Sequence, residues 1–168
     1  MVIENKLDYG RLENKLASTI KYDFKITTNS GSPIVSAIPT SFKPKIAIIT
    51  YGGCVHPVLE SIDKLFYEYE ILPCVIVLSQ IYPMDIDGLE QLLKNLDYIF
   101  TVEEGNIDGG IGSEIIASLS EIPILAKKKY QRIGSYNIPI PSTKELEKEV
   151  LVNSQKIVNE VGRCYENS

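Results

Sequence analysis

The stretch Lys45-Ile-Ala-Ile-Ile-Thr50, followed by Tyr51-Gly52-Gly53, decides the fold class of this chain. Its apolar residues run without alternation, which is typical of a strand buried on both faces. A stripe of apolar residues at helical spacing follows directly, at Val58, Leu59, Ile62, Leu65, Phe66 and Tyr69. Parallel strands need a crossover connection, usually a helix, so this order predicts one repeat of a parallel α/β fold.

The same repeat recurs further along the chain. Residues 73–79 and 97–104 are two more apolar runs of strand length, and each precedes a segment with helical spacing. The first of these helices is expected to begin at a capping box formed by Asp87 and Glu90. A fourth strand is expected at residues 122–126, and a closing helical region is expected to open at Ser142. Together the repeats predict an α/β fold, a three-layer α/β/α sandwich with a mostly parallel open sheet.

The N-terminal part differs from these repeats. Residues 1–33 are polar and lack a sustained period, which predicts an arm or linker ahead of a domain at residues 34–168. The extended run at residues 34–38 is expected to add an edge strand to the sheet.

Composition excludes several classes of function. Lys and Arg total 17 against 22 Asp and Glu, a net charge of −5, whereas nucleic-acid binding needs a basic face. No apolar run approaches the roughly 18 residues of a membrane span, and the charged N-terminal stretch is unlike a secretory signal. The cysteines Cys54, Cys74 and Cys164 are odd in number and far apart, which favours reduced thiols over disulfides or zinc. These features predict a cytoplasmic protein that binds neither nucleic acid nor a membrane.

Candidate functional residues gather at the carboxyl ends of the predicted strands, where ligands bind in open α/β sheets. The most prominent motif is the glycine-rich turn of residues 105–114. It has two interpretations: an anion cradle at a helix N-terminus, or a tight turn that allows close packing of the helix. The second is favoured because no third glycine or Lys-Ser/Thr pair follows. Glu103, Glu104, Asp108 and Glu114 would also repel a phosphate.

Catalytic groups are scarce. His56 is the one histidine, so a metal site built on a histidine pair is excluded. A hydrolase that uses Cys54 and His56 is disfavoured, because the Gly-x-Ser-x-Gly elbow is absent and the two residues stand only two apart. The prediction is therefore no catalytic residue, no cofactor-binding residue and no metal ligand in this chain.

Three motifs in order resemble a known family. They are Tyr51-Gly52 after a strand, Pro83-Met84-Asp85 after the second strand, and Glu103-Glu104 ahead of Gly109-Gly110-Ile111-Gly112-Ser113. This series resembles the C-terminal domain of transketolase-like, thiamine-diphosphate-dependent enzymes. It is most similar to the beta subunit of the decarboxylating component of 2-oxo acid dehydrogenase complexes, such as pyruvate dehydrogenase. Residues 2–10 more weakly resemble the end of the preceding pyrimidine-binding domain.

The resemblance implies a transketolase C-terminal-domain-like fold and a non-catalytic role in assembly or dimerisation. Thiamine diphosphate and magnesium would belong to the parent enzyme, and the isolated chain would be inactive. The implied partners are other domains or subunits of that enzyme, a second copy of the chain, and the acyltransferase core. The interface candidates are His56, Tyr82, Asp85, Glu103, Gly109, Gly110 and Gly112.

Two questions stay open at this point. The parent substrate could be pyruvate, a branched 2-oxo acid or a sugar phosphate. The alternative function is a free-standing module on the same scaffold that binds a small anion or regulates a partner. Replacing Glu103 with Lys or Asp85 with Arg is expected to weaken assembly and leave the fold intact.

Overall fold

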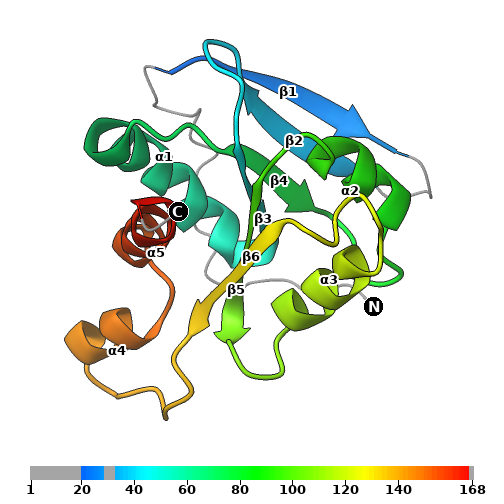
Figure 1. The fold of residues 1–168 in the computed structure, drawn as a ribbon. Coiled ribbons are helices and arrows are strands. Elements are labelled where there is room, and N and C mark those ends of the chain that lie inside the picture. The colour runs from blue at the N-terminus through cyan, green and yellow to red at the C-terminus, as the bar shows by residue number, and fades with distance from the viewer. Residues whose placement is uncertain (1–19, 29–32, 167–168) are drawn as a thin grey trace.

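Within the part of the chain that the structure describes, six strands form one sheet with helices on both of its faces (Figure 1). The computed structural model describes residues 20–28 and 33–166. The strands are β1 (Tyr22–Thr27), β2 (Ile34–Pro39), β3 (Ile46–Thr50), β4 (Cys74–Leu78), β5 (Tyr98–Asn106) and β6 (Lys129–Ser135). The helices are the 3-10 turn η2 (Gly52–Cys54), α1 (Val55–Tyr69), α2 (Ile86–Leu93), α3 (Ile111–Ser120), α4 (Lys144–Val150) and α5 (Ser154–Glu166).

The sheet has a parallel centre and an antiparallel edge. Its order is β1-β2-β4-β3-β5-β6, in which β4, β3, β5 and β6 are parallel. Strands β2 and β1 pair antiparallel beyond β4. The chain moves to one side of β3 to form β4 and to the other side to form β5. This change of direction creates a switch point at the carboxyl ends of β3 and β5, where ligands of open α/β sheets bind.

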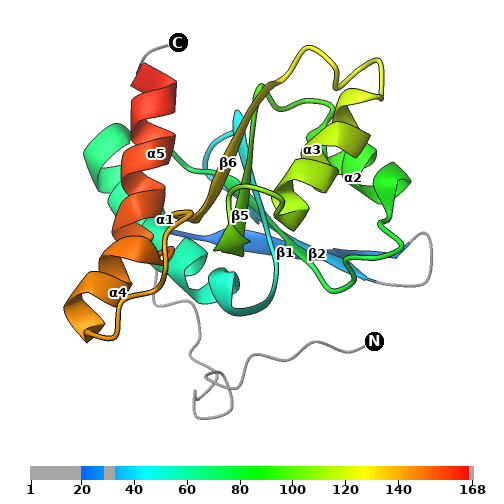
Figure 2. The same ribbon diagram turned by 90° about the horizontal axis from the view of Figure 1, so that it is seen from below.

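Two apolar cores separate the three layers. One core packs α1 and α5 against one face of the sheet and includes Ile48, Phe100 and Val158. The other packs α2 and α3 against the opposite face and includes Ile49, Leu89 and Ile115. Figure 2 shows the two helical layers on either side of the strands. The predicted α/β/α sandwich with a mostly parallel sheet is confirmed.

The predicted fourth strand at residues 122–126 is wrong. This segment is a turn in which the N–H groups of Leu125 and Ala126 both donate to the carbonyl of Ile122, at 2.9 Å. Leu125 points into the core and Ile124 is half exposed, which mimics the apolar content of a strand. The real strand, β6, begins at Lys129. Its first half is polar because it lies at the edge of the sheet.

The helix starts also differ from the sequence prediction. Helix α2 begins at Ile86, one residue before Asp87, and its N-cap is Asp85, whose carboxylate accepts from the Gly88 N–H at 3.0 Å. The closing helical region divides into α4 and α5, which are separated at residues 151–153. Leu146 of α4 is half exposed.

The N-terminal segment contributes a strand to the sheet. Residues 22–27, inside the region predicted to be an arm, form β1 and pair with β2. The Tyr22 hydroxyl donates to the Pro73 carbonyl at 3.2 Å, and its ring packs against the core beside α1. Residues 2–10, which resemble the end of a preceding domain, lie outside the described residues.

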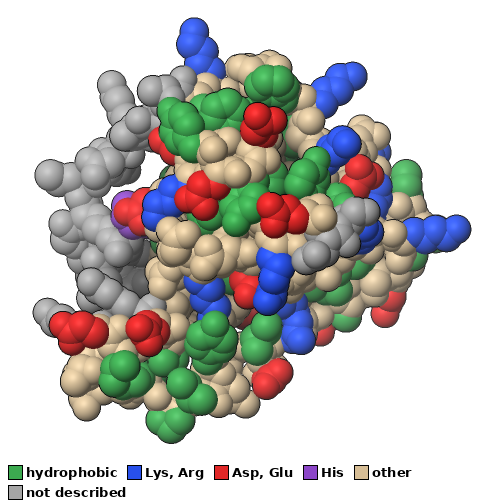
Figure 3. Space-filling view, turned by 60° about the vertical axis from the view of Figure 1, so that its left-hand side comes forward, with side chains coloured by type: hydrophobic (Ala, Val, Ile, Leu, Met, Phe, Trp, Pro, Cys, Tyr) green, Lys and Arg blue, Asp and Glu red, His purple; other side chains and the backbone are tan. Residues whose placement is uncertain are grey.

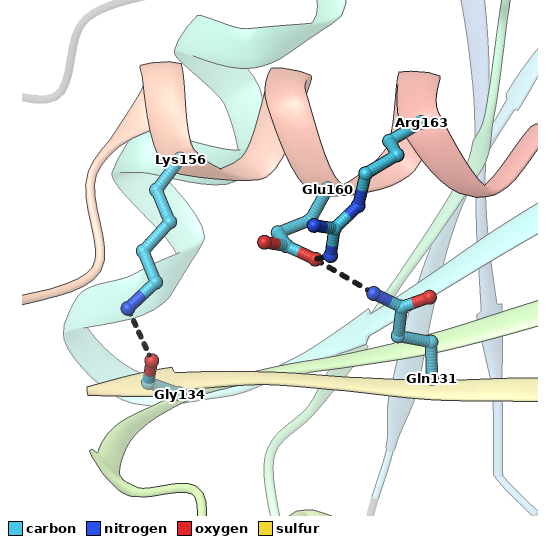
Figure 4. A network of polar contacts seen from close by, with 5 residues as sticks. All are labelled: Gln131, Gly134, Lys156, Glu160 and Arg163. Atoms are coloured by element: carbon cyan, nitrogen blue, oxygen red, sulfur yellow. Dashed lines mark hydrogen bonds and ion pairs between the residues drawn. The ribbon is translucent and has the colours of Figure 1, made fainter. Parts of the chain in front are cut away.

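Helix α5 is held to its neighbours by polar contacts on one side and close packing on the other. Figure 4 shows Lys156 Nζ donating to the Gly134 carbonyl of β6 at 2.8 Å. In the same view the Glu160 carboxylate accepts from Gln131 of β6 and from Arg163. On the side that faces α1, Gly162 meets the ring of Tyr69: a Cβ at Gly162 would lie 2.6 Å from the ring carbon Cε1.

Candidate functional site

The buried carboxylate of Glu103 is the centre of the switch-point edge. Glu103 stands near the end of β5, and its side chain is almost fully buried. Its Oε1 accepts from the Gly112 N–H in the first turn of α3 at 3.0 Å, and its Oε2 accepts from the Tyr51 hydroxyl at 3.3 Å. One side chain thus joins the ends of β3 and β5 to the start of α3.

The glycines of the α3 turn allow this contact. A Cβ at Gly110 would lie 2.5 Å from Glu103 Oε1, and a Cβ at Gly112 would lie 2.5 Å from Thr101 Oγ1. Cβ atoms essentially never come this close to another atom, so a side chain at either position would force Glu103 or Thr101 to move. The structure therefore favours close packing as the reason for this motif, the second of the two interpretations drawn from the sequence.

The position that a phosphate would take at the start of α3 is filled by the protein itself. A helix N-terminus attracts anions through its free N–H groups and its dipole. Here the anion is the Glu103 carboxylate, and Glu104, Asp108 and Glu114 add negative charge within the same stretch. A phosphate or pyrophosphate would have to displace a buried carboxylate, so these residues do not fit such a group.

Tyr51 acts as a neutral hydrogen-bond donor at this edge. Burial, followed by the neighbouring Glu103 carboxylate, raises the pKa of Tyr51 above its usual range. The hydroxyl therefore keeps its proton. A group so placed orients a carboxylate and gives no proton to a substrate at neutral pH.

Two buried oxygens near this edge have no hydrogen-bond partner among the described residues. They are Thr101 Oγ1, on β5 beneath Gly112, and Asp85 Oδ2, beside the start of α2. Asp85 uses its other oxygen to cap α2, so its buried carboxylate stabilises the helix start.

The glycine-rich loop is also held from β6. Arg132 donates to the Ile107 carbonyl and to the Ser113 hydroxyl, and Ser135 donates to the Glu104 carbonyl at 2.7 Å. Sequence reasoning missed Arg132 and Ser135 because it placed the strand seven residues too early, counted from residue 122 to residue 129. The run from Lys129 to Ser135 shows neither an unbroken apolar stretch nor strict alternation, so its sequence carries no clear strand signal.

The interface candidates divide by exposure. Tyr82 is 89% exposed, His56 is exposed and pairs with Glu60 at 2.9 Å, and Gly109 is exposed with a φ of 74°. These three can touch a partner directly.

The other candidates lie inside the domain. Asp85, Glu103 and Gly112 are buried, and Gly110 is half-buried against Glu103. The expectation that Glu103→Lys and Asp85→Arg leave the fold intact is therefore corrected. Each change would place a cation where a buried carboxylate accepts a backbone N–H, and both variants are expected to destabilise the domain.

The structure does not support a Cys54–His56 hydrolase. Cys54 is buried, and burial together with Glu104 and Glu103 raises the pKa of its thiol to about 12. A reactive cysteine needs the opposite environment, one that stabilises the thiolate. His56 points to solvent and pairs with Glu60.

Comparison with known proteins identifies the family. The model of the family described as transketolase, C-terminal domain, matches residues 37–157, which is well over half of the chain. The chain belongs to this family. The match spans β2 to the start of α5 and includes every element that contributes to the Glu103 site.

The relatives of this transketolase C-terminal domain include beta subunits. It is 28% identical over 166 residues to the mitochondrial pyruvate dehydrogenase E1 component subunit beta of Saccharomyces cerevisiae, covering 95% of the chain and 42% of that protein. It is 30% identical to the corresponding subunit of Dictyostelium discoideum, covering 94% of the chain and 45% of that protein. The chain therefore spans less than half the length of these relatives.

A solved structure shares the fold. It is described as a split gene transketolase, inactive beta4 tetramer, and superimposes with a TM-score of 0.63 at 23% identity. The overlap covers 72% of this chain and 39% of that one.

Other features of the domain bear on what it can bind. Among residues 20–28 and 33–166, no three His, Cys, Asp or Glu side chains gather in a way that could hold a metal ion. Two surface cavities, of about 470 and 660 Å³, lie at the amino ends of β3 and β5, and both are lined by Lys45 and Tyr165. The switch-point edge is at the opposite ends of these strands.

No described helix is both long enough and apolar enough to cross a membrane.

On the side that carries α1 and α5, acidic and basic side chains are interspersed (Figure 3). That face therefore lacks the basic stripe that nucleic-acid binding requires.

Proposed function

We propose that this chain is the non-catalytic C-terminal assembly domain of a thiamine-diphosphate-dependent enzyme that acts on a 2-oxo acid. The family match and the two E1 beta relatives support this class of parent enzyme. Thiamine diphosphate and magnesium would be bound by other parts of the enzyme. The chain spans less than half the length of these relatives, so a separate segment or chain would supply those parts. A reducing, cytoplasmic location agrees with Cys54, Cys74 and Cys164, none of which is joined in a disulfide.

The observation that carries the proposal is the Glu103 carboxylate at the start of α3. This edge is where an α/β domain of this topology would bind a phosphate ligand. Here the Gly112 N–H, which would donate to such a ligand, already donates to the Glu103 carboxylate. The same observation counts against the alternative of a free-standing small-anion module. The part of this edge that is accessible to a partner consists of exposed residues around the buried Glu103.

The partner surface would be formed by the exposed part of this edge. Tyr82 precedes α2, His56 lies in the first turn of α1, and Gly109 lies in the loop before α3. An exposed tyrosine at the rim of a well-packed edge is a typical interface residue. The buried residues Asp85 and Glu103 would fix the shape of this surface without touching the partner.

The test begins with the isolated chain. Calorimetry with thiamine diphosphate and Mg²⁺ should give no binding heat, and a 2-oxo acid such as pyruvate should give no reduction of an artificial electron acceptor. Addition of the cofactor-binding chain from the same source should restore both signals. Binding or turnover by the isolated chain would contradict the proposal.

The surface is tested by a matched pair of variants. Tyr82→Ala should reduce association with the cofactor-binding chain about tenfold or more, as expected for an aromatic interface anchor. Tyr67→Ala is the control, because Tyr67 is 71% exposed but lies near the far end of α1. Equal association of the two variants would exclude Tyr82 from the interface.

A further inference from the structure

We propose that β1 is a self-association strand, which pairs antiparallel with β1 of a second copy of this chain around a two-fold axis at Phe24. This inference concerns the opposite edge of the sheet from β6 and does not depend on the function proposed above. It starts from the position of β1 as the terminal strand among the described residues. A terminal strand presents unpaired backbone groups that another strand can take up.

The side chains of β1 are unusually open. Phe24 is 56% exposed and Ile26 is 72% exposed, on the sheet face that α1 and α5 cover further inward. Their neighbours across the sheet on β2 are Ala37 and Val35. Asp23 and Lys25 occupy the other face and are exposed as well. The strand thus carries an apolar face and a charged face, and both are accessible.

The backbone of β1 is oriented for pairing through its even-numbered residues. The Thr40 N–H donates to the Lys21 carbonyl at 3.1 Å, and the Ser36 hydroxyl donates to the Lys25 carbonyl at 3.5 Å. Odd-numbered residues therefore direct their backbone groups toward β2. Because these directions alternate along a strand, Tyr22, Phe24 and Ile26 direct their N–H and C=O groups to the open edge.

The charges and the length of β1 together select one register. With the two-fold axis at Phe24, Asp23 of each copy lies opposite Lys25 of the other, which gives two opposite-charge pairs at closely spaced positions. On the apolar face, Phe24 meets Phe24 and Tyr22 meets Ile26. The outward N–H and C=O groups of all three residues are then paired.

Neighbouring registers are unfavourable. An axis at Asp23 would place Asp23 opposite Asp23 and Lys21 opposite Lys25, and an axis at Lys25 would place the two Lys25 side chains opposite each other. An axis at Tyr22 would place Asp23 opposite Lys21, but the two β1 strands would then overlap only at Tyr22. Charged residues on an edge strand normally prevent pairing, because they meet like charges or are buried unpaired. In β1, Asp23 and Lys25 carry opposite charges and stand two residues apart. Around a two-fold axis at Phe24 each meets the opposite charge of the other copy, so these residues favour pairing with a second copy.

Charge reversal in the full-length chain tests this register. The native chain should show a concentration-dependent monomer–dimer equilibrium in sedimentation experiments at low salt. Asp23→Lys and Lys25→Asp should each weaken the dimer by roughly tenfold, because both pairs then become like-charged. A mixture of these two variants should form a heterodimer, since every Lys then faces an Asp. Glu68→Lys is the control, an exposed charge reversal on α1 that should leave the dimer unchanged.

Three outcomes would overturn the proposal. They are a native chain that stays monomeric at high concentration, single variants that dimerise like the native chain, and a variant mixture that fails to associate. Thermal unfolding of each variant distinguishes a lost interface from a lost fold, because these exposed changes should leave the midpoint near that of the native chain. Loss of self-association would not affect cofactor binding by the reconstituted enzyme, so the two proposals fail separately.

Discussion

At the scale of single residues, one buried carboxylate explains the conformation of the most prominent motif. Glu103 accepts from the Gly112 N–H and from the Tyr51 hydroxyl, and the glycines at 110 and 112 leave room for it. A buried N–H group that loses its acceptor costs far more than a normal hydrogen bond contributes. The conformation of the glycine-rich turn therefore depends on the Glu103 side chain.

Substitution of Glu103 should reveal this dependence. Glu103→Ala leaves the Gly112 N–H without its acceptor and is expected to lower the free energy of unfolding by about 2–3 kcal/mol. Glu103→Gln keeps an oxygen for Gly112 and should cost about 1 kcal/mol. Urea unfolding followed by circular dichroism measures both. Equal stability of the Glu103→Ala variant and the native chain would mean that the hydrogen bonds of Glu103 do not stabilise the fold.

The buried thiols give a second prediction at this scale. Burial raises the pKa of Cys74 to about 12, and burial with Glu104 and Glu103 raises that of Cys54 to about 12, from an ordinary value of 9.0. At pH 8, a thiol reagent should modify the half-buried Cys164 of the folded protein first. Cys54 and Cys74 should react only after unfolding. Rapid modification of all three thiols in the folded state would contradict this.

The same shifts give a pH dependence of stability. Below pH 9 both thiols are protonated in the folded and unfolded chains, and their contribution to stability is fully present. As the pH rises toward 12, the unfolded chain releases these protons while the folded chain retains them, so stability falls. The double variant Cys54→Ser/Cys74→Ser should show a shallower fall over this window. Burial also raises the pKa values of Tyr22 and Tyr51, so these two tyrosines account for part of the fall in stability that remains in the double variant.

At the scale of elements, prediction from sequence succeeded where a strand is buried on both faces. Strands β3, β4 and β5 were placed to within two residues, because an unbroken apolar run has one simple interpretation. Strands β1 and β6 were missed because an edge strand is partly solvated and its sequence is mixed. Residues 122–126 were wrongly predicted to be a strand because their sequence is mostly apolar. A turn that buries Leu125 carries as many apolar residues as a short strand.

The candidate site was predicted less completely than the fold. The edge of the sheet and Glu103 followed from strand order, but burial of Asp85 and Glu103 did not. Asp85 lies in a segment whose sequence is equally compatible with an exposed loop, and Glu103 lies near the end of a predicted strand, where a carboxylate is equally compatible with exposure. Their burial depends on the close approach of α2 and α3, which is a tertiary property. Arg132 could not be placed, because its strand was assigned elsewhere.

Packing of α5 on α1 gives a prediction for an element. Gly162 of α5 lies against the ring of Tyr69, where a Cβ would come within 2.6 Å of Cε1. Gly162→Ala should therefore lower stability by about 1–3 kcal/mol through overpacking, although alanine favours a helix. Asn159→Ala, an exposed change on the same helix, should stay within about 0.5 kcal/mol of the native chain. A more stable Gly162→Ala protein would show that the helices separate easily.

At the scale of the whole molecule, the domain combines a rigid parallel centre with two different edges. The switch-point edge uses its polar groups internally and exposes Tyr82, His56 and Gly109. The β1 edge exposes backbone and apolar side chains. Neither arrangement resembles a catalytic cleft. Both edges present accessible side chains of the kind that the proposed assembly role requires.

Whether β1 belongs to the folding unit is a question about the molecule as a whole. Removal of residues 1–33 would delete β1 and make β2 the edge strand, and β2 is mostly buried and almost entirely apolar. It would also remove the hydrogen bond from Tyr22 to Pro73. We expect this truncated chain to unfold at lower temperature and to aggregate, because a long apolar edge invites strand pairing without a fixed register. A chain that begins at residue 20 retains β1 and is the control, expected to match the full chain in thermal unfolding. If both truncations behaved alike, the boundary between arm and domain would fall at residues 33 and 34, and β1 would be an addition to a sheet that is stable without it.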